Sequence, residues 1–210
     1  MSVKFVRRLS ESDFLGVWCI EETEENDFPF VLSERLRSIV AQYKNQRRKI
    51  EVLCTYALLF SMTGRQDLVI NHLPSGKPFL EDWYLSITHT LGYVSVLLSR
   101  KHEVALDMEY RSSRVQRVAK RFLRPDEHPE NLDELLLHWC AKESAYKYWS
   151  SSNLEFEEIK VYPIVDDVLK KGNLCVENMR EGTCLSLVFE FFSDAVLVYS
   201  EVDKESENKE

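Results

Sequence analysis

The stretch Tyr84-Leu-Ser-Ile-Thr-His-Thr-Leu-Gly-Tyr-Val-Ser-Val-Leu-Leu-Ser99 predicts two β-strands joined by a turn. The strands are expected over residues 84–88 and 93–99, with the turn at Leu91-Gly92 between them. A third strand, over residues 104–109, follows shortly after. Because helical patterns lie on both sides of these strands, the predicted fold class is α+β.

Helices are predicted both before and after these strands. A helical pattern covers residues 32–63, with Ser33 as its N-cap and Gly64 as its stop. Residues 113–124 form a second helix, because apolar side chains recur there at helical spacing. A third helix is expected over residues 132–149.

The remaining strands complete an order that repeats. They are predicted over residues 3–6, 14–20, 68–70, 159–165, 174–177, 184–192 and 195–202. The order is strand, helices, strands, and then the same again, so we expect two similar, pseudo-duplicated α/β lobes, residues 1–102 and 103–202. The acidic tail 203–210 has no apolar residue and is expected to be disordered. No GxGxxG or P-loop pattern indicates a nucleotide-binding parallel sheet.

Composition narrows the class of protein. The 210 residues are 44% hydrophobic and 30% charged, which is typical of a globular protein. The five cysteines are odd in number and scattered, which argues against a disulfide framework or a zinc site. A net charge of −8 argues against nonspecific nucleic-acid binding. No signal peptide or apolar run of roughly 20 residues is seen, so we expect a cytoplasmic protein without membrane contact.

Asp107 and Glu109 form the first candidate site. Residues two apart on a strand point to the same face, so both carboxylates project together while Leu106 and Met108 face the core. Adjacent carboxylates repel unless a cation lies between them, and Mg²⁺ commonly takes one or two protein carboxylates together with substrate phosphates. Acidic pairs are also common on exposed strand faces, so a purely structural interpretation stays open.

The predicted helix over residues 132–149 carries the second candidate site. Trp139, Glu143 and Lys147 are spaced i, i+4 and i+8, so they share one face of the helix. The alternative is an ordinary stabilising pair between Glu143 and Lys147. That alternative does not account for their place beside Trp139 in a well-packed helix.

Two shorter segments are compatible with phosphate binding. His89 lies in Ser86-Ile-Thr-His-Thr90 at the end of a predicted strand, where its imidazole can donate to a phosphate. It can equally hydrogen-bond to carbonyl groups of the turn. Lys77 lies in Gly76-Lys-Pro78, which by itself indicates only a turn.

Together these segments resemble the motifs of the 4'-phosphopantetheinyl transferase superfamily. The family's motifs run in the order Gly-(Arg/Lys)-Pro, Ser-x-Ser-His-Ser, Gly-x-Asp-x-Glu and Trp-x-x-Lys-Glu-(Ala/Ser)-x-x-Lys. In the same order this chain has Gly76-Lys-Pro78, Ser86-Ile-Thr-His-Thr90, Ala105-Leu-Asp-Met-Glu109 and Trp139-Cys-Ala-Lys-Glu-Ser-Ala-Tyr-Lys147. The intervening segment 121–127 is similar to the family's aromatic-plus-glutamate segment. The chain length resembles the two-lobed, monomeric surfactin-synthetase-activating type.

The resemblance implies a Mg²⁺-dependent holo-[acyl-carrier-protein] synthase. Such an enzyme transfers the 4'-phosphopantetheine moiety of coenzyme A to a serine of an apo carrier protein and releases 3',5'-ADP. Coenzyme A would bind in an active site between the two lobes. The residues expected to contact coenzyme A are Arg47 or Arg48, Lys77, His89, Thr90, Asp107, Lys142 and Lys147. Of the two arginines the family's spacing slightly favours Arg48, and the alternative is that both are merely solvated.

The resemblance also implies the metal ligands and the catalytic groups. Asp107, Glu109 and Glu143 would hold Mg²⁺ against the pyrophosphate. Glu143 would remove the proton of the carrier serine, either directly or through a metal-bound water. Lys147 would stabilise the transferring phosphoryl group, or instead pair with Glu143 and position it. His89 is counted with this catalytic group.

The carrier protein is expected to meet a basic surface over residues 111–124. Carrier proteins of this family are acidic, and so is this chain, so association requires a local patch of positive charge. The segment has six basic residues and no acidic one: Arg111, Arg114, Arg117, Lys120, Arg121 and Arg124. A solvated polar helix face is the alternative.

Two other functions remain open at this point. One is a non-catalytic protein that holds coenzyme A or a carrier, which would be indicated by loss of a metal or base residue. The other is a Mg²⁺-dependent phosphohydrolase using the same carboxylates. The carrier itself, whether of fatty-acid, polyketide or nonribosomal peptide biosynthesis, is left open.

Overall fold

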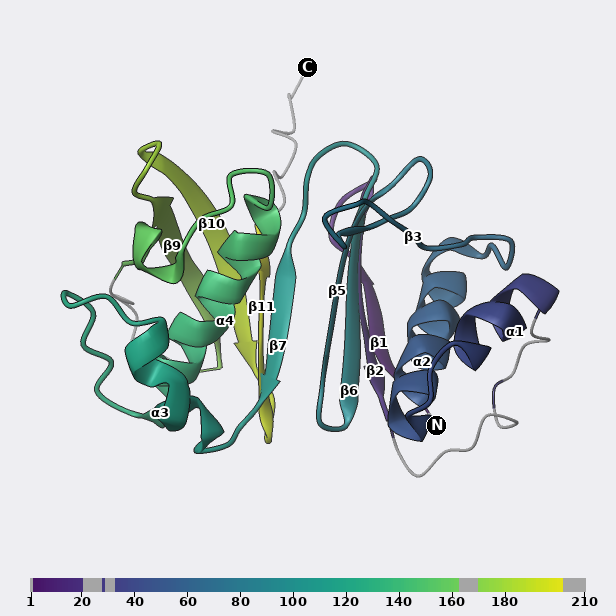
Figure 1. Ribbon diagram of the computed structural model, residues 1–210, viewed down its shortest axis with the longest axis horizontal. Coiled ribbons are helices and arrows are strands. Elements are labelled where there is room, and N and C mark those ends of the chain that lie inside the picture. The colour runs from purple at the N-terminus through teal and green to yellow at the C-terminus, as the bar shows by residue number, and fades with distance from the viewer. Residues whose placement is uncertain (1, 21–27, 29–32, 163–169, 202–210) are drawn as a thin grey trace, which may run out of the picture. The chain divides into compact units, whose positions relative to one another are not determined.

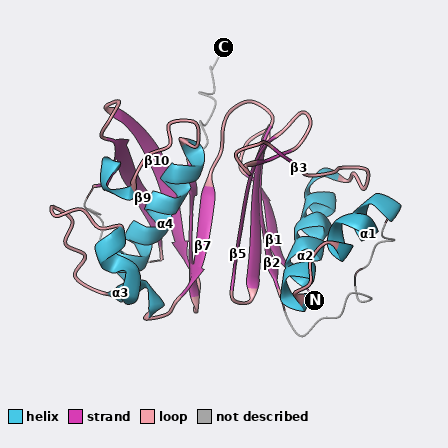
Figure 2. Ribbon diagram, in the orientation of Figure 1, coloured by secondary structure: helices cyan, strands magenta, loops and turns pink. Residues whose placement is uncertain are grey.

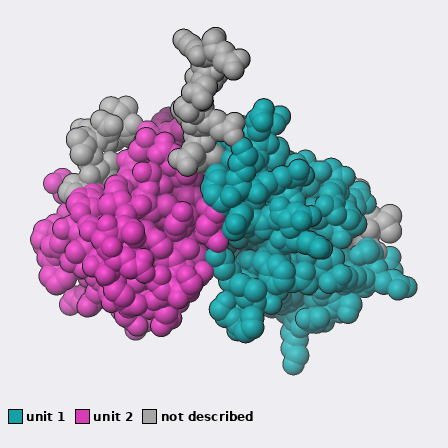
Figure 3. Space-filling model, turned by 90° about the horizontal axis from the view of Figure 1, so that it is seen from above, with its two compact units in different colours: residues 1–102 teal, residues 103–210 magenta. Residues whose placement is uncertain are grey.

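A computed structural model of the protein describes residues 2–20, 28, 33–162 and 170–201 (Figure 1). The chain divides into two compact units, unit 1 with residues 1–102 and unit 2 with residues 103–210 (Figure 3). Each unit combines helices with a β-sheet, so the predicted α+β class is confirmed (Figure 2). None of the helices among the described residues is long and apolar enough to cross a membrane.

The described part of unit 1 contains a four-stranded antiparallel sheet. Its strands lie in the order β1 (Ser2–Arg8), β2 (Asp13–Cys19), β6 (Tyr93–Ser99) and β5 (Tyr84–Thr90). The hairpin between β5 and β6 turns at Gly92, whose φ of 80° is a conformation that favours glycine. The two strands and the turn predicted over this stretch are confirmed.

Two helices take the place of the single helical stretch predicted over residues 32–63. Helix α1 (Glu34–Ala41) begins after Ser33, whose hydroxyl accepts a hydrogen bond from the backbone N–H of Leu36. Helix α2 (Gln46–Thr63) has its own cap, because the side chain of Asn45 accepts from the backbone N–H of Arg48. The predicted cap at Ser33 and stop at Gly64 are confirmed, but the helix is interrupted between them.

Helix α2 lies along one face of the unit 1 sheet (Figure 1). The side chains of Leu53 and Leu58 in this helix are fully buried. At Gly16 of β2 the helix comes so close that an added Cβ atom would lie 2.7 Å from the side chain of Leu58. The core of unit 1 is therefore the layer between α2 and the sheet.

The loop that follows α2 differs from the prediction. No strand forms over residues 68–70, because the N–H of Ile70 donates to the Tyr56 hydroxyl instead of to a neighbouring strand. A small hairpin forms instead from β3 (Asn71–His72) and β4 (Pro78–Phe79). The Gly76-Lys-Pro78 motif lies in the turn of this hairpin.

The described part of unit 2 contains a five-stranded antiparallel sheet. Its strands lie in the order β7 (Leu106–Tyr110), β11 (Ala195–Ser200), β10 (Thr183–Phe191), β9 (Lys171–Asn178) and β8 (Ile159–Val161). All the predicted strands of this half are present with shifted ends. Residues 163–165 and 202 of the predicted strands, and the predicted tail, lie outside the described residues.

Unit 2 has one long helix and one short one. Helix α4 (Leu132–Tyr148) confirms the prediction, and Asn131 caps it by accepting from two backbone N–H groups. The helix predicted over residues 113–124 is shorter: α3 (Arg114–Val118) ends in a single 3₁₀ turn over 119–121. Beyond this turn the carbonyl of Phe122 accepts a side-chain hydrogen bond from Lys142.

The two units share a strand pattern. In each unit, the strand that precedes the long helix in the sequence pairs antiparallel with the last described strand of the unit. That last strand also pairs with the strand that comes just before it in the sequence. These strands are β2, β6 and β5 in unit 1 and β7, β11 and β10 in unit 2. The long helix packs on the first two strands in both cases, α2 in unit 1 and α4 in unit 2.

Candidate functional site

Strand β7 holds two carboxylates against helix α4. Asp107 and Glu109 alternate with Leu106 and Met108, as predicted. The side chains of Asp107 and Glu109 lie on the face of the sheet that α4 covers, where both contact residues of that helix. Leu106 and Met108 are buried on the opposite face, and on the α4 side Asp107 is buried while Glu109 is half-buried.

Trp139, Glu143 and Lys147 lie on the face of helix α4 that is turned toward these carboxylates. Their spacing along the sequence predicted that they share one face. The indole Nε1 of Trp139 donates to Glu109 Oε1 at 3.1 Å. The Lys147 ammonium donates to Asp107 Oδ1 at 2.8 Å and to the carbonyl of Leu106 at 2.9 Å. Lys147 therefore pairs with Asp107 rather than with Glu143.

Glu143 lies on α4, one helical turn from Trp139 and one from Lys147, and the pKa of its carboxyl is strongly raised. Burial is the main cause that raises the pKa of Glu143 from its ordinary value of 4.5 to about 7. The negative charges of Asp107 and Glu109 raise it further, and the positive charge of Lys147 lowers it. The site therefore favours a proton or a cation at Glu143, and this carboxyl can exchange a proton near neutral pH.

The residue types fit a hard cation. Among the residues that the structure describes, no group of three or more His, Cys, Asp or Glu side chains is arranged to hold a metal ion. Mg²⁺ does not need such a cage, since it usually combines one or two carboxylates with substrate phosphates and water. Besides burial, the negative charges of Asp107 and Glu109 raise the pKa of Glu143, and a divalent cation would relieve this repulsion.

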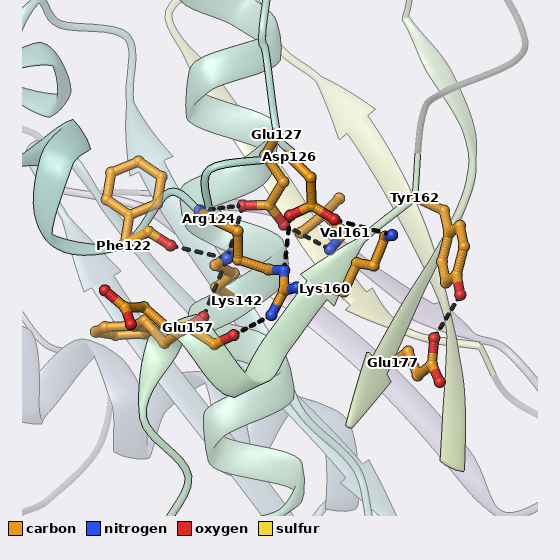
Figure 4. Close-up of polar contacts among 11 residues, drawn as sticks. Phe122, Arg124, Asp126, Glu127, Lys142, Glu157, Lys160, Val161, Tyr162 and Glu177 are labelled. Atoms are coloured by element: carbon orange, nitrogen blue, oxygen red, sulfur yellow. Dashed lines mark hydrogen bonds and ion pairs between the residues drawn. The ribbon is translucent and has the colours of Figure 1, made fainter. Parts of the chain in front are cut away.

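The side chain of Lys142 contacts a different set of residues (Figure 4). It is fully buried, and its ammonium contacts Glu127 Oε2 at 2.8 Å, the Phe122 carbonyl at 2.8 Å and the Phe156 carbonyl at 3.0 Å. These contacts use all three N–H donors of the ammonium group. In this structure Lys142 is a core residue, and its contacts give no support to the expectation that it binds coenzyme A, which stays a prediction.

Glu127 completes the buried network around Lys142 (Figure 4). Its carboxylate also accepts from the backbone N–H groups of Arg124 at 2.9 Å and Val161 at 2.8 Å. The network thus ties the segment after α3 and strand β8 to helix α4. Charge pattern alone did not predict this pairing, although Glu127 ends a segment that the family resemblance had marked.

The basic segment 111–124 is less extensive than predicted. Arg111 forms an ion pair with Asp133 at 2.6 Å, and Arg124 forms one with Asp126 at 2.9 Å. The other four basic side chains are exposed and form no ion pair with any described residue: Arg114, Arg117, Lys120 and Arg121. The predicted inward apolar stripe is confirmed, with Val115 and Phe122 buried.

A second polar cluster lies within unit 1, around Glu51 of α2. Arg47 Nε lies 3.1 Å from Glu51 Oε1, and Arg48 Nη1 lies 3.1 Å from Oε2. His89 Nδ1, from the end of β5, lies 3.3 Å from the same Oε2. The structure therefore brings together three of the predicted phosphate contacts, around a carboxylate that the sequence analysis did not single out.

The other two residues predicted in unit 1 lie elsewhere. Lys77 lies in the turn between β3 and β4. Thr90 follows His89 on β5 and therefore points to the opposite face of the strand. From β5, His89 joins the arginines of α2 around Glu51.

Comparison with known proteins bears on unit 2. The family model of the 4'-phosphopantetheinyl transferase superfamily matches residues 103–195. No curated protein matches the chain. The matched segment includes the carboxylates of β7, the whole of α4 and the Glu127–Lys142 pair. The resemblance to this superfamily is therefore confirmed over residues 103–195.

Proposed function

We propose that this protein transfers the 4'-phosphopantetheine moiety of coenzyme A to a serine of an apo carrier protein. The observation that carries the proposal is the meeting of Asp107 and Glu109 with Glu143 and Lys147 between β7 and α4. The family match over residues 103–195 supports it, because that segment contains all four residues.

Asp107, Glu109 and Glu143 would hold Mg²⁺. When bound, the cation would neutralise negative charge on the pyrophosphate of coenzyme A and on the departing 3',5'-ADP. In this structure Lys147 forms an ion pair with Asp107, and the Trp139 indole donates to Glu109. These two contacts keep the carboxylates in place for a ligand.

Glu143 is the proposed general base. A carboxyl with a pKa of about 7 suits proton transfer at neutral pH, since about half of it is ionised there and the ionised form is basic enough to accept a proton. It would take the proton of the carrier serine as the serine oxygen bonds to the β-phosphorus and the bond to 3',5'-ADP breaks. Lys147 would stabilise charge on the phosphoryl oxygens while its contact with Asp107 positions that carboxylate.

In unit 1 the proposed phosphate contacts are Arg47, Arg48 and His89, with Lys77 and Thr90 as further candidates. The contacts around Glu51 support this assignment, because Arg47, Arg48 and His89 all lie within ion-pair distance of its carboxylate. We further infer that the units arose by duplication and that the protein is of the surfactin-synthetase-activating type. The strand pattern common to the two units supports this inference.

The decisive test is direct. The protein is incubated with coenzyme A, Mg²⁺ and a panel of apo carrier proteins, and each carrier is weighed by mass spectrometry. We expect at least one carrier to gain a phosphopantetheine group, and chelation of Mg²⁺ to prevent the gain. A panel that stays unmodified beside an active control enzyme would reject the function. Release of inorganic phosphate from coenzyme A without carrier modification would instead indicate a phosphohydrolase.

Charge reversal on the exposed basic residues tests the carrier surface. Replacing Arg117 and Arg121 together by glutamate is expected to raise the KM for an acidic carrier by about tenfold or more, because steering by opposite charge is lost. The KM for coenzyme A should stay unchanged. Lys170→Glu reverses an exposed charge elsewhere in unit 2 and serves as the control. Equal carrier kinetics for the double variant and this control would remove the surface from the proposal.

A further inference from the structure

Glu51 is a buried carboxylate beneath three exposed basic side chains. Its side chain is 6% exposed, whereas those of Arg47, Arg48 and His89 are 55%, 40% and 43% exposed. Arg47 and Arg48 reach it from the preceding turn of α2, and His89 reaches it from the last residues of β5. One acidic group in the interior therefore gathers three basic groups at the surface of unit 1.

The contacts engage only part of each guanidinium group. Arg47 uses Nε and Arg48 uses Nη1 toward Glu51, while the Arg48 guanidinium also lies over the ring of Tyr43 at 5.6 Å. A guanidinium carries five N–H donors. The other side-chain N–H groups of these arginines donate to no residue that the structure describes.

The charge of the cluster is positive. Two arginines and one glutamate sum to +1, and protonation of His89 makes the sum +2. An arrangement of convergent guanidinium and imidazole donors suits a phosphate monoester, which is dianionic and accepts several hydrogen bonds at once. A diester with a single negative charge would use fewer of these donors.

We propose that Glu51 is a positioning residue that holds Arg47, Arg48 and His89 together to receive a terminal phosphate monoester of the substrate. Glu51 itself would not touch the ligand, because it lies beneath the three side chains. The proposal rests on the proposed function for the identity of that ligand, since coenzyme A and its product 3',5'-ADP both carry such a group. It predicts selection against nucleotides that lack the group.

A variant without the charge of Glu51 distinguishes two roles for this carboxylate, positioning of the basic side chains and a simple effect of its negative charge. If the carboxylate acted only through its charge, its removal would make the surface more positive and anions would bind more tightly. If it positions the donors, its removal lets three like charges separate, and a phosphate monoester binds more weakly. The two explanations predict changes of opposite sign.

The experiment is calorimetric titration of the full-length protein and of Glu51→Gln with 3',5'-ADP and with 5'-AMP, which lacks the 3'-phosphate. We expect Glu51→Gln to weaken 3',5'-ADP binding by about tenfold or more, the size of one or two lost charge-assisted contacts, and to leave 5'-AMP binding unchanged. Tighter or unchanged binding of 3',5'-ADP would overturn the proposal. An equal loss for both nucleotides would also overturn it, because that indicates a general loss of structure.

Two further variants complete the design. Glu34→Gln removes one exposed acidic charge of the same unit and should change neither affinity. Glu51→Asp keeps the charge but shortens the side chain, so it should still weaken the binding of 3',5'-ADP and leave that of 5'-AMP unchanged. This variant replaces Glu51→Gln if Glu51→Gln does not fold. Unchanged 3',5'-ADP binding in Glu51→Asp would contradict positioning.

The outcome is separable from that of the proposed function. Wild-type protein that modifies a carrier but does not prefer 3',5'-ADP to 5'-AMP keeps the function and rejects the role of Glu51. Protein that modifies no carrier but loses its 3',5'-ADP preference on Glu51→Gln rejects the function and keeps the positioning role.

Discussion

Replacing Glu143 by glutamine is expected to lower the rate of carrier modification by a factor of about 10²–10⁴, the usual contribution of a general base. Glutamine keeps the shape of the side chain but cannot accept the serine proton. The rate is measured in a single turnover by the mass shift of the carrier. Glu157→Gln, an exposed glutamate of the same unit, should leave the rate unchanged. A fully active Glu143→Gln would show that another group is the base.

The same substitution is expected to stabilise the metal-free protein at alkaline pH. The pKa of Glu143 is about 7 in the folded state against 4.5 ordinarily, so the folded state binds more protons between these values. The contribution of this carboxyl to stability is present below pH 4.5 and is lost as pH rises through 7, a change of at most about 3 kcal/mol. Urea unfolding at pH 8 should therefore find Glu143→Gln more stable than wild type, and at pH 4 the difference should vanish.

Mg²⁺ provides the complementary measurement. If Glu143 is one of its ligands, Mg²⁺ should raise the midpoint of thermal unfolding of the wild type at pH 8. At pH 5.5 Mg²⁺ should raise this midpoint less, because a proton then competes with Mg²⁺ for the Glu143 carboxylate. Glu143→Gln should reduce the shift at pH 8. An equal shift in wild type and variant would exclude Glu143 as a ligand.

Replacing Lys142 by methionine is expected to lower the free energy of unfolding by about 3–5 kcal/mol, because it leaves the Glu127 carboxylate buried without its partner. The Phe122 and Phe156 carbonyls would lose a donor as well. Urea unfolding measures the loss. Lys160→Met is the matched control, since Lys160 forms an exposed ion pair with Asp126 at 3.0 Å and should contribute at most about 1 kcal/mol.

Two further observations test this account of Lys142. Glu127→Gln combined with Lys142→Met should recover part of the loss, because the double variant no longer buries an unpaired carboxylate. Below its unfolding temperature, Lys142→Met should keep the wild-type KM for coenzyme A. If Lys142→Met is as stable as the wild type but has a higher KM for coenzyme A alone, Lys142 contributes to the coenzyme A site.

Local signals in the sequence were sufficient for much of the secondary structure. Ser33 and Gly64 mark helix ends through hydrogen bonds and backbone angles within one turn, so their residue types alone predicted them. The turn at Gly92 is equally local. The interruption after α1 was missed because Asn45 is also an acceptable residue within a helix. The early end of α3 was missed because apolar side chains continue at helical spacing to Leu123, beyond the last helical residue, Val118.

The candidate site divides in the same way. The sequence by itself determined the spacing of Asp107 and Glu109 along a strand and of Trp139, Glu143 and Lys147 along a helix, because strand and helix periods are properties of the backbone. Only the tertiary structure decided which partners these side chains meet: Lys147 meets Asp107, Lys142 meets Glu127, and Arg47, Arg48 and His89 meet Glu51. The physical reason is that most of these partners come from different elements, and a residue type states which charge a side chain carries but not which way the packed core directs it.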